Sequence, residues 1–335
     1  MRKDVCPLPL AVIYGGAGNE REISKVSAEF FLSAAARSGV PMLRIFIDKD
    51  GSFYIEKDEK RIPTYPVLVN SESGFLSGSE IISVSAAFPI LHGDLGEDGR
   101  VQGALSTAGI RIFGADTLSG AICSDKAYTK MIAEACGVKT APFVTLIRDE
   151  GCSRAIARAE ELGYPLFIKP TSLGSSIGAN EARNIKELRK ALECAFSYSE
   201  RVLAERLIED KRELECAYFS VGDKRLISPP AEVLVKGFYD YDTKYRLPAR
   251  TVLRARVSEK ISKRLIGLTD TLAVALSVRH IARFDYFLLP DGEILFNEVN
   301  TCPGMTDSSL YPRMLDSLGV SPEELAKIAA RPDEW

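Results

Sequence analysis

Near the C-terminal end, two short apolar segments that carry charged residues flank a Pro-Asp-Gly turn; they are RFDYF at 283–287 and FNEVN at 296–300. If Asp-Gly forms a two-residue hairpin turn, Asp285 faces Glu298. The same register places Arg283 opposite Asn300, with all four side chains on one face. Two opposed carboxylates repel unless a cation lies between them, and oxygen ligands at this spacing suit Mg²⁺ that also binds phosphate oxygens. The pattern therefore predicts a metal site, with a solvated outer face and a simple Arg283 ion pair as the alternative.

A glycine-rich segment follows a predicted apolar strand, and its sequence is KPTSLGSSIG at 169–178. Glycines let backbone N–H groups turn inward around phosphate oxygens, hydroxyls add donors, and Lys169 adds a positive charge. The segment lacks the Gly-Lys-Ser/Thr ending of a P-loop. Taken alone, it indicates a phosphate-binding loop and a plain surface turn equally well.

A third polar segment, HGDLGEDG at 92–99, directly follows the apolar run AAFPIL. It is therefore expected at the carboxyl end of a strand, where open sheets bind ligands. His92 is one of only two histidines in the chain. A lone histidine is more often structural than catalytic, so His92 becomes a site candidate only beside the other motifs, and His280 is expected to be structural.

The chain opens with alternating strands and helices. Residues 10–14 (LAVIY) predict a buried strand, and a helix is expected from Asn19 as its N-cap to a stop at Gly39. Further predicted elements are strands at 42–47 and 85–91 and a helix near 99–108. This order indicates an open parallel sheet in an N-terminal α/β domain of residues 1–114.

The rest of the chain predicts two more domains, α/β or α+β in class. Residues 115–206 form the first; its predicted elements are helices at 125–136, 153–162 and 184–196 and strands at 143–147, 165–169 and 201–206. Residues 207–335 form the second, in which long strands replace the alternation. Its predicted elements are strands at 213–221 and 225–234, an irregular stretch at 236–250, a helix at 258–278 and the two strands of the hairpin.

Composition excludes several classes of protein. The 335 residues are 46% hydrophobic, which is ordinary for a globular chain, and the net charge of −3 offers no reason to expect nucleic acid as a partner. Seven scattered cysteines without a Cys-x-x-Cys spacing favour free thiols in a reducing cytoplasm. No segment reaches the roughly 20 apolar residues that span a bilayer, so no membrane partner is expected.

Taken together, the motifs resemble the D-alanine:D-alanine ligase family. Their order and spacing match over nearly the whole chain, and they are GGAGNEREIS (15–24), HGDLGEDG (92–99), SDK (124–126), KPTSLGSSIG (169–178), YDYDTKY (239–245), RFDYF (283–287) and NEVNTCPGMTDSSLYP (297–312). The resemblance implies a three-domain ATP-grasp fold, in which the nucleotide lies between the central and C-terminal domains.

The resemblance also implies which residues hold the nucleotide and metal. Lys126 and Lys169 would contact ATP phosphates, with Ser176 of the glycine-rich loop beside them, and Lys244 would reach the γ-phosphate. Adenine and ribose would be held by Glu205, Arg206, Leu207 and Glu213, although the stretch between the two glutamates is one residue longer than the family pattern. The implied ligands of two Mg²⁺ ions, with Mn²⁺ as a possible substitute, are Asp285, Glu298 and Asn300.

Substrate-binding residues follow from the same resemblance. Glu20, Ser175 and Tyr245 match a trio that links the first amino acid to a closing loop. Helix-dipole stabilisation would also explain Glu20, and an ordinary loop would also explain Tyr245. Arg283 and the Gly304 N–H would form the oxyanion site. His92, Ser309 and Leu310 complete the set, and apolar Leu310 favours D-alanine over D-serine as acceptor.

The leading hypothesis is an ADP-forming ligase that joins two D-alanines for peptidoglycan synthesis, expected as a cytoplasmic homodimer. The alternative is a resistance-type ligase that uses D-serine or, less readily, D-lactate; Ser308, where relatives often have histidine, keeps the acceptor open, and Tyr245 argues against lactate. A non-catalytic nucleotide-binding protein is disfavoured by the intact metal-site residues. A dinucleotide-binding dehydrogenase is disfavoured because GGAGNE does not fit Gly-x-Gly-x-x-Gly.

Overall fold

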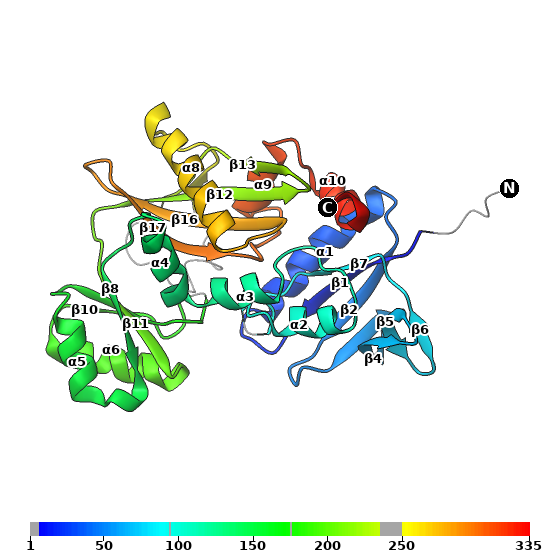
Figure 1. The fold of residues 1–335 in the computed structure, drawn as a ribbon, viewed down its shortest axis with the longest axis horizontal. Helices are drawn as coiled ribbons and strands as arrows, with labels where there is room; N and C mark the ends of the chain where they lie inside the picture. The colour runs from blue at the N-terminus through cyan, green and yellow to red at the C-terminus, as the bar shows by residue number, and fades with distance from the viewer. Residues whose placement is uncertain (1–6, 94, 175, 235–249) are drawn as a thin grey trace.

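The computed structural model describes residues 7–93, 95–174, 176–234 and 250–335. Three β-sheets of seven, four and six strands, each with its own helices, make up the described fold. The N-terminal sheet and the four-stranded sheet lie at opposite ends of the molecule, and the C-terminal sheet lies between and above them in the view of Figure 1. The predicted α/β and α+β class is confirmed.

Parallel strands form one half of the N-terminal sheet. β1 (Leu10–Gly15) lies between β2 (Met42–Ile47) and β7 (Ala86–Pro89) and is parallel to both, as predicted. Helices α1 (Arg21–Arg37) and α2 (Arg100–Thr107) complete the predicted units. The expected N-cap at Asn19 is wrong, because α1 is preceded by Glu20, whose side chain makes no capping hydrogen bond.

The other half of the N-terminal sheet is an antiparallel meander that the sequence patterns did not predict. Its strands are β3 (Phe53–Lys57), β4 (Lys60–Val69), β5 (Glu72–Ser77) and β6 (Glu80–Ile82). β4 contains Pro63 and Pro66, which normally exclude a residue from a central strand. Here the first half of β4 pairs only with β3 and the second half only with β5, so each proline nitrogen can face an unpaired side.

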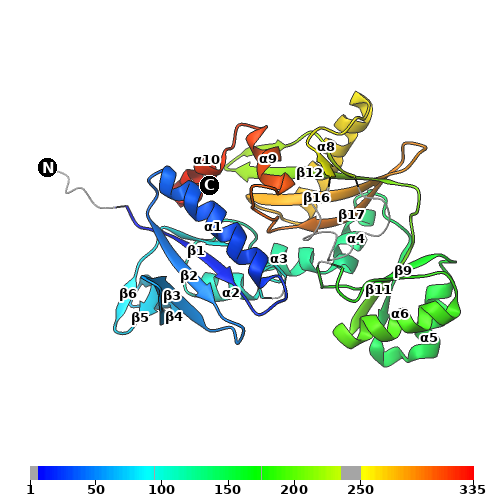
Figure 2. The same ribbon diagram turned by 180° about the vertical axis from the view of Figure 1, so that it is seen from behind.

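A four-stranded antiparallel sheet of order β10-β9-β11-β8 forms the central part of the chain. Helices α5 and α6 pack against it around a core of Leu146, Ile168 and Leu192 (Figure 2). The elements are α3 (Thr117–Ser124), α4 (Lys126–Ala135), β8 (Phe143–Ile147), a 3₁₀ turn (Arg148–Glu150), α5 (Cys152–Glu160), β9 (Leu166–Pro170), β10 (Asn180–Ala182), α6 (Ile185–Tyr198) and β11 (Arg201–Arg206).

The C-terminal sheet has the order β15-β14-β12-β16-β17, with β13 paired to β12. α4 and α8 pack on one face, and α9, α10 and part of α1 pack on the core of the other. The elements are β12 (Arg212–Val221), β13 (Lys224–Ile227), β14 (Ala231–Leu234), β15 (Arg250–Val252), α8 (Glu259–Ala275), β16 (Ile281–Leu288), β17 (Ile294–Asn300), α9 (Leu310–Asp316), α10 (Pro322–Ala329) and a final 3₁₀ turn (Pro332–Glu334).

Apolar contacts cross the predicted domain limits. α4 belongs to the core of the C-terminal sheet, and α10 packs against α1 (Figure 1). The division at residues 114 and 206 therefore stays a prediction. Across the described ranges, no helix combines the length and apolar character that a bilayer crossing requires.

His280 joins the N-terminal and C-terminal parts of the molecule. Its ring stacks on Phe113 with a centroid distance of 4.6 Å, and Trp335 packs at an angle against both rings, 4.8 Å from His280 and 5.4 Å from Phe113. Nδ1 of His280 lies 3.0 Å from the Gly114 nitrogen and 3.2 Å from the Gly114 carbonyl oxygen, so one tautomer of the ring accepts from the N–H and the other donates to the carbonyl. Burial lowers the pKa of His280 to about 4. The expected structural role of His280 is therefore supported by its contacts.

Replacing His280→Asn tests this joint. Because the native pKa lies near 4 and the unfolded value near 6.5, protonation of the unfolded chain costs the wild type stability as pH falls from 6.5 towards 4. Asn tolerates the positive φ of 59° and can accept the same N–H, but it does not titrate. Relative to the variant, the wild type should lose about 2 kcal/mol of unfolding free energy between pH 7 and pH 5 in urea titrations. A difference that does not change with pH would contradict the role.

Candidate active site

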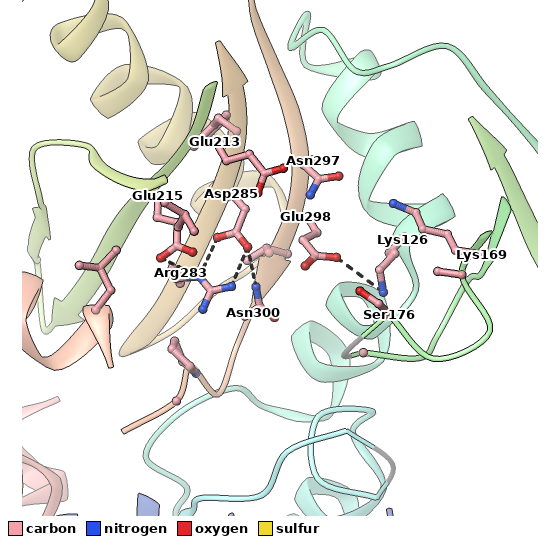
Figure 3. A pocket seen from close by; sticks show the side chains of 18 of the residues that line it. Lys126, Lys169, Ser176, Glu213, Glu215, Arg283, Asp285, Asn297, Glu298 and Asn300 are labelled. Atoms are coloured by element: carbon pink, nitrogen blue, oxygen red, sulfur yellow. Dashed lines mark hydrogen bonds and ion pairs between the residues drawn. The ribbon is translucent and has the colours of Figure 1, made fainter. Parts of the chain in front are cut away.

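One cleft of about 1610 Å³ opens between the three sheets and receives side chains from each of them. The N-terminal part contributes Glu20 and residues of the 92–99 segment, and the central part contributes Lys126 and the glycine-rich segment. The hairpin of β16 and β17 forms the opposite wall (Figure 3). The cleft therefore joins all three motifs that the sequence patterns singled out.

The hairpin pairs its polar residues as predicted, but its turn and strand register differ from the prediction. Asp285 pairs with Glu298 and Arg283 pairs with Asn300. The predicted two-residue turn is wrong, because Leu289 bonds to Glu293 and leaves a three-residue loop. This longer loop shifts the register by one residue, and a β-bulge beyond Asp285 shifts it back. The two deviations cancel at the site.

Asp285 is held by a bidentate contact with the neighbouring guanidinium on the same face of β16. Nε and Nη2 of Arg283 each lie 2.7 Å from a carboxylate oxygen of Asp285, and Asn300 Nδ2 donates to Oδ2 over 3.2 Å. Glu215 Oε2, on β12, lies 3.4 Å from Arg283 Nε. Burial alone would lower the pKa of Arg283, but these carboxylates raise it well above its usual value, so the guanidinium stays charged.

Glu298 faces the first helical residue of α4. Its Oε2 lies 3.7 Å from Nζ of Lys126, and Figure 3 shows the two side chains meeting across the cleft. Asp125 caps α4 by accepting the N–H groups of Ala127 and Tyr128, which fixes where the lysine emerges. Lys126 also donates to the Leu173 carbonyl over 2.8 Å, so one side chain connects β17 to the glycine-rich segment.

A buried triad lies deeper in the cleft wall. Glu205 Oε1 is 2.7 Å from Nζ of Lys169, and Oε2 is 3.4 Å from Nζ of Lys130. Burial alone would raise the pKa of Glu205, but the two lysines outweigh it and lower that pKa, so Glu205 is ionised. The predicted nucleotide residues Lys169 and Glu205 are thus brought together.

The other residues assigned to the base and ribose lie along the same wall. Glu213 lines the cleft from β12, 3.3 Å from Nζ of Lys211. Arg206 instead donates to the Leu162 carbonyl, and the Leu207 N–H donates to the Pro165 carbonyl over 2.9 Å. Arg206 and Leu207 also line the cleft, but the Arg206 guanidinium N–H and the Leu207 backbone N–H donate to carbonyls of the protein.

Glu20 lies between two loops at the N-terminal side. A Cβ atom on Gly93 would lie 2.5 Å from Glu20 Oε2, and one on Gly174 would lie 3.2 Å from the same atom. The carboxylate thus lies close to the backbone of both loops. His92 is buried, with Nε2 3.2 Å from the Ser27 hydroxyl, which also accepts the Met305 N–H. Burial lowers the pKa of His92, which favours a neutral ring.

Glu97 connects two loops at the end of the cleft where Glu20 lies. Its Oε2 accepts the Gly93 N–H over 2.9 Å, and its Oε1 accepts the Cys302 N–H over 3.3 Å. Burial and the nearby Glu20 charge raise the pKa of Glu97 to about 7. Glu97 stands within a motif noted in the sequence, yet it was not among the predicted site residues.

The predicted oxyanion and acceptor residues form one short turn before α9. Gly304 faces the Ser309 hydroxyl, since a Cβ there would lie 3.3 Å from Oγ. Ser309 precedes α9, and its Oγ accepts the Thr306 N–H over 3.1 Å. Leu310 is buried in the core and also lines the cleft. Ser309 therefore offers a hydroxyl and Leu310 an apolar side chain to the same region.

Three predicted residues, Ser175, Lys244 and Tyr245, lie outside the described residues. Ser176 is described and lines the cleft. Besides Glu97, the sequence patterns missed three polar side chains at or behind the wall; they are Lys130, Glu215 and Asn297. Lys130 follows Lys126 by four residues on a helix and Glu215 follows Glu213 by two on a strand, so helical and strand periodicity could have found both. Asn297 is the extra residue of the bulge, which no periodicity predicts.

Solved structures with the same arrangement define the class. VanG D-Ala:D-Ser ligase from Enterococcus faecalis has a TM-score of 0.87 and 33% identity, covering 97% of this chain and 98% of its own. D-alanyl-alanine synthetase A from Vibrio cholerae also has a TM-score of 0.87, with 29% identity over 97% and 98% of the two chains. The fold is that of a ligase of the ATP-grasp class.

Sequence comparison narrows the class. The models described as D-ala D-ala ligase N-terminus and C-terminus match residues 9–115 and 132–329. D-alanine–D-alanine ligase A of Chromobacterium violaceum is 36% identical, covering 94% of this chain and 92% of its own. D-alanine–D-alanine ligase of Streptococcus pneumoniae is 34% identical, covering 94% and 93%. The chain belongs to the D-alanine–D-alanine ligase family.

Replacing Glu97→Gln tests the contact between the two loops. Because the native pKa of about 7 exceeds the unfolded value of 4.5, the wild type loses stability as pH rises from 4.5 through 7. The amide does not titrate, so the variant should gain about 2 kcal/mol of unfolding free energy relative to the wild type between pH 5 and pH 7. The amide has only one acceptor oxygen and cannot accept both N–H groups. This lowers the unfolding free energy of the variant by about 1–3 kcal/mol at every pH. Urea titrations in which the two proteins respond identically to pH would count against a buried ionisable contact.

Proposed function

We propose that this protein is an ATP-dependent ligase that joins two D-alanines into D-alanyl-D-alanine for peptidoglycan precursors. One observation carries the proposal: a single cleft brings Lys126 and Lys169 to face the hairpin residues Asp285 and Glu298. Membership of the family and the names of its curated relatives support it. A cytoplasmic homodimer is part of the same proposal.

The nucleotide would lie between the central and C-terminal sheets. Lys126 and Lys169 would exchange their present carboxylate partners for ATP phosphates, with Ser176 beside them and Lys244 at the γ-phosphate. At the other end, the residues proposed for adenine and ribose are Glu205, Arg206, Leu207 and Glu213. Glu205 is ionised and therefore an acceptor only, which suits the amino group of adenine.

The hairpin residues fit a divalent cation. Asp285, Glu298 and Asn300 offer hard oxygen ligands on one face, and they would hold two Mg²⁺ ions, or Mn²⁺. Among the described residues, no three acidic, histidine or cysteine side chains could hold a metal by themselves. An incomplete set of protein ligands of this kind is expected where phosphate oxygens of the nucleotide complete the coordination of the metal. When bound, the metal would neutralise phosphate charge.

The chain's own residues would then guide two steps. The carboxylate of the first D-alanine, oriented by Glu20 with Ser175, Tyr245 and His92, bonds to the γ-phosphorus, and ADP leaves. The amine of the second D-alanine attacks the acyl phosphate carbon, and phosphate leaves. Arg283 and the Gly304 N–H would bind the oxyanion that develops in this second step. Exclusion of water from this end of the cleft would protect the acyl phosphate from hydrolysis.

The acceptor separates two candidate activities. Leu310 presents an apolar side chain at the cleft, next to Ser309, which favours D-alanine over D-serine. D-serine stays a second candidate because VanG, named as a D-Ala:D-Ser ligase, has the same fold at 33% identity.

An acceptor-competition assay tests the function. With ATP, Mg²⁺ and D-alanine, the purified protein should form D-alanyl-D-alanine and release one ADP and one phosphate for each dipeptide. With D-alanine, D-serine and D-lactate mixed, chromatography should find the D-alanine product in excess. ADP release without dipeptide would end the ligase proposal, and an excess of D-alanyl-D-serine would favour the second candidate.

The substitution Glu298→Gln tests the metal site. Loss of one ligand charge should weaken Mn²⁺ binding by about 10–100-fold. Electron paramagnetic resonance in the presence of a non-hydrolysable ATP analogue measures this affinity. Dipeptide formation should fall at least as much, because the metal is needed at the phosphates. Glu293→Gln, at the exposed Lys139 pair, is the matched control and should leave both unchanged. Wild-type metal affinity in the Glu298 variant would refute the assigned role.

A further inference from the structure

Lys130 is a fully buried lysine on α4 that the proposed reaction does not use. Its side chain has 0% exposure, and Nζ lies 3.4 Å from Glu205 Oε2. Within the described ranges, this ammonium has no hydrogen bond of normal geometry. Lys169, on the other side of Glu205, has 10% side-chain exposure and lines the cleft, whereas Lys130 does not line it. The two lysines therefore occupy unequal positions around one carboxylate.

Burying an ammonium costs several kcal/mol unless an opposite charge compensates it. Burial lowers the pKa of Lys130, and Glu205 opposes that shift. With both lysines protonated, the triad of Lys130, Glu205 and Lys169 has a net charge of +1, one cation more than Glu205 needs. One lysine can therefore leave Glu205 without leaving a buried carboxylate unpaired. Only Lys169 borders the cleft, so Lys169 is the one that can leave.

We propose that Lys130 is a positioning residue for the nucleotide, acting through Glu205. Lys130 holds Glu205 ionised and oriented at the base end of the cleft, so that Lys169 can give up its carboxylate partner and bind the phosphate chain. The inference rests on the proposed function for the identity of the nucleotide. Glu205 then accepts from the 6-amino group of adenine, whereas guanine presents a carbonyl oxygen at position 6, so Lys130 also contributes to discrimination between ATP and GTP.

Without Lys130, one carboxylate and one lysine remain. Lys169 must then stay with Glu205, because an unpaired buried carboxylate is costly, and the phosphates lose a cation. The Lys130→Met substitution keeps the length of the side chain and removes its charge. ATP affinity should fall while binding of the amino acid substrates, which lies towards Glu20 and Ser309, should not.

A double-mutant cycle tests the inference. The four proteins are the wild type, Lys130→Met, Glu205→Gln and the double variant, and calorimetry with Mg²⁺ and no D-alanine gives the dissociation constants of ATP and GTP. Lys130→Met should weaken ATP binding at least about 10-fold and narrow the preference for ATP over GTP. In the Glu205→Gln background the same substitution should change ATP binding less than about 2-fold, because no carboxylate remains to be held. The KM for D-alanine should stay within about 2-fold in Lys130→Met.

Equal losses of ATP affinity in both backgrounds, or an equal rise in the KM for D-alanine, would assign Lys130 to general packing and overturn the inference. If Lys130→Met does not fold, Lys130→Gln gives the same cycle, and the double variant replaces the buried charges with neutral groups that such sites often tolerate. Because the nucleotide-binding cycle is measured without D-alanine, its result does not depend on dipeptide formation; only the KM comparison does. If the binding cycle gives the expected result but no dipeptide forms, only the ligase proposal is refuted.

Discussion

Compensation of buried charge is the constraint on which the cleft depends. Three of its carboxylates lie against cations: Asp285 against Arg283, Glu298 against Lys126, and Glu205 against two lysines. A buried carboxylate without a partner is strongly destabilising, so the strands that carry the acids and the helix that carries the lysines have to meet at fixed positions. A ligand that brings its own negative charge, as a triphosphate does, can take over these cations without leaving the site unbalanced when divalent ions accompany it.

The substrate end of the cleft depends on contacts between segments far apart in the chain. Glu97 bonds to the N–H of Cys302, and Ser27 connects His92 to Met305. His280 and the packing of α10 on α1 hold the same two parts together from behind. The raised pKa of Glu97 and the lowered pKa of His280 act on stability in opposite directions between pH 5 and pH 7. Together they make the joint less sensitive to pH than either group alone would.

The described residues that the sequence patterns named for the site all line the cleft, but only part of the fold was predicted. Long periodic elements such as α1, β1 and β2 were predicted because their apolar spacing is strong. The meander was missed because Pro63 and Pro66 argue against a strand unless each half of β4 has a single partner, and pairing of that kind is set by tertiary structure. The hairpin residues were placed correctly although the turn was not. Helical spacing puts Lys130 on the same face as Lys126, but its burial beside Glu205, 75 residues away, is set by tertiary structure.

The bulge beyond Asp285 has a consequence for how this site could change. In a regular strand, neighbouring side chains alternate between faces, but Asn297 and Glu298 both line the cleft. The extra residue adds a second polar group without lengthening the hairpin. Shortening the loop at Pro290–Gly292 by one residue would have to be matched by loss of the bulge, or Glu298 would slide away from Asp285. Insertions and deletions in this hairpin would thus be tolerated only in compensating pairs. This restricts how the hairpin sequence can evolve, and single substitutions would not reveal it.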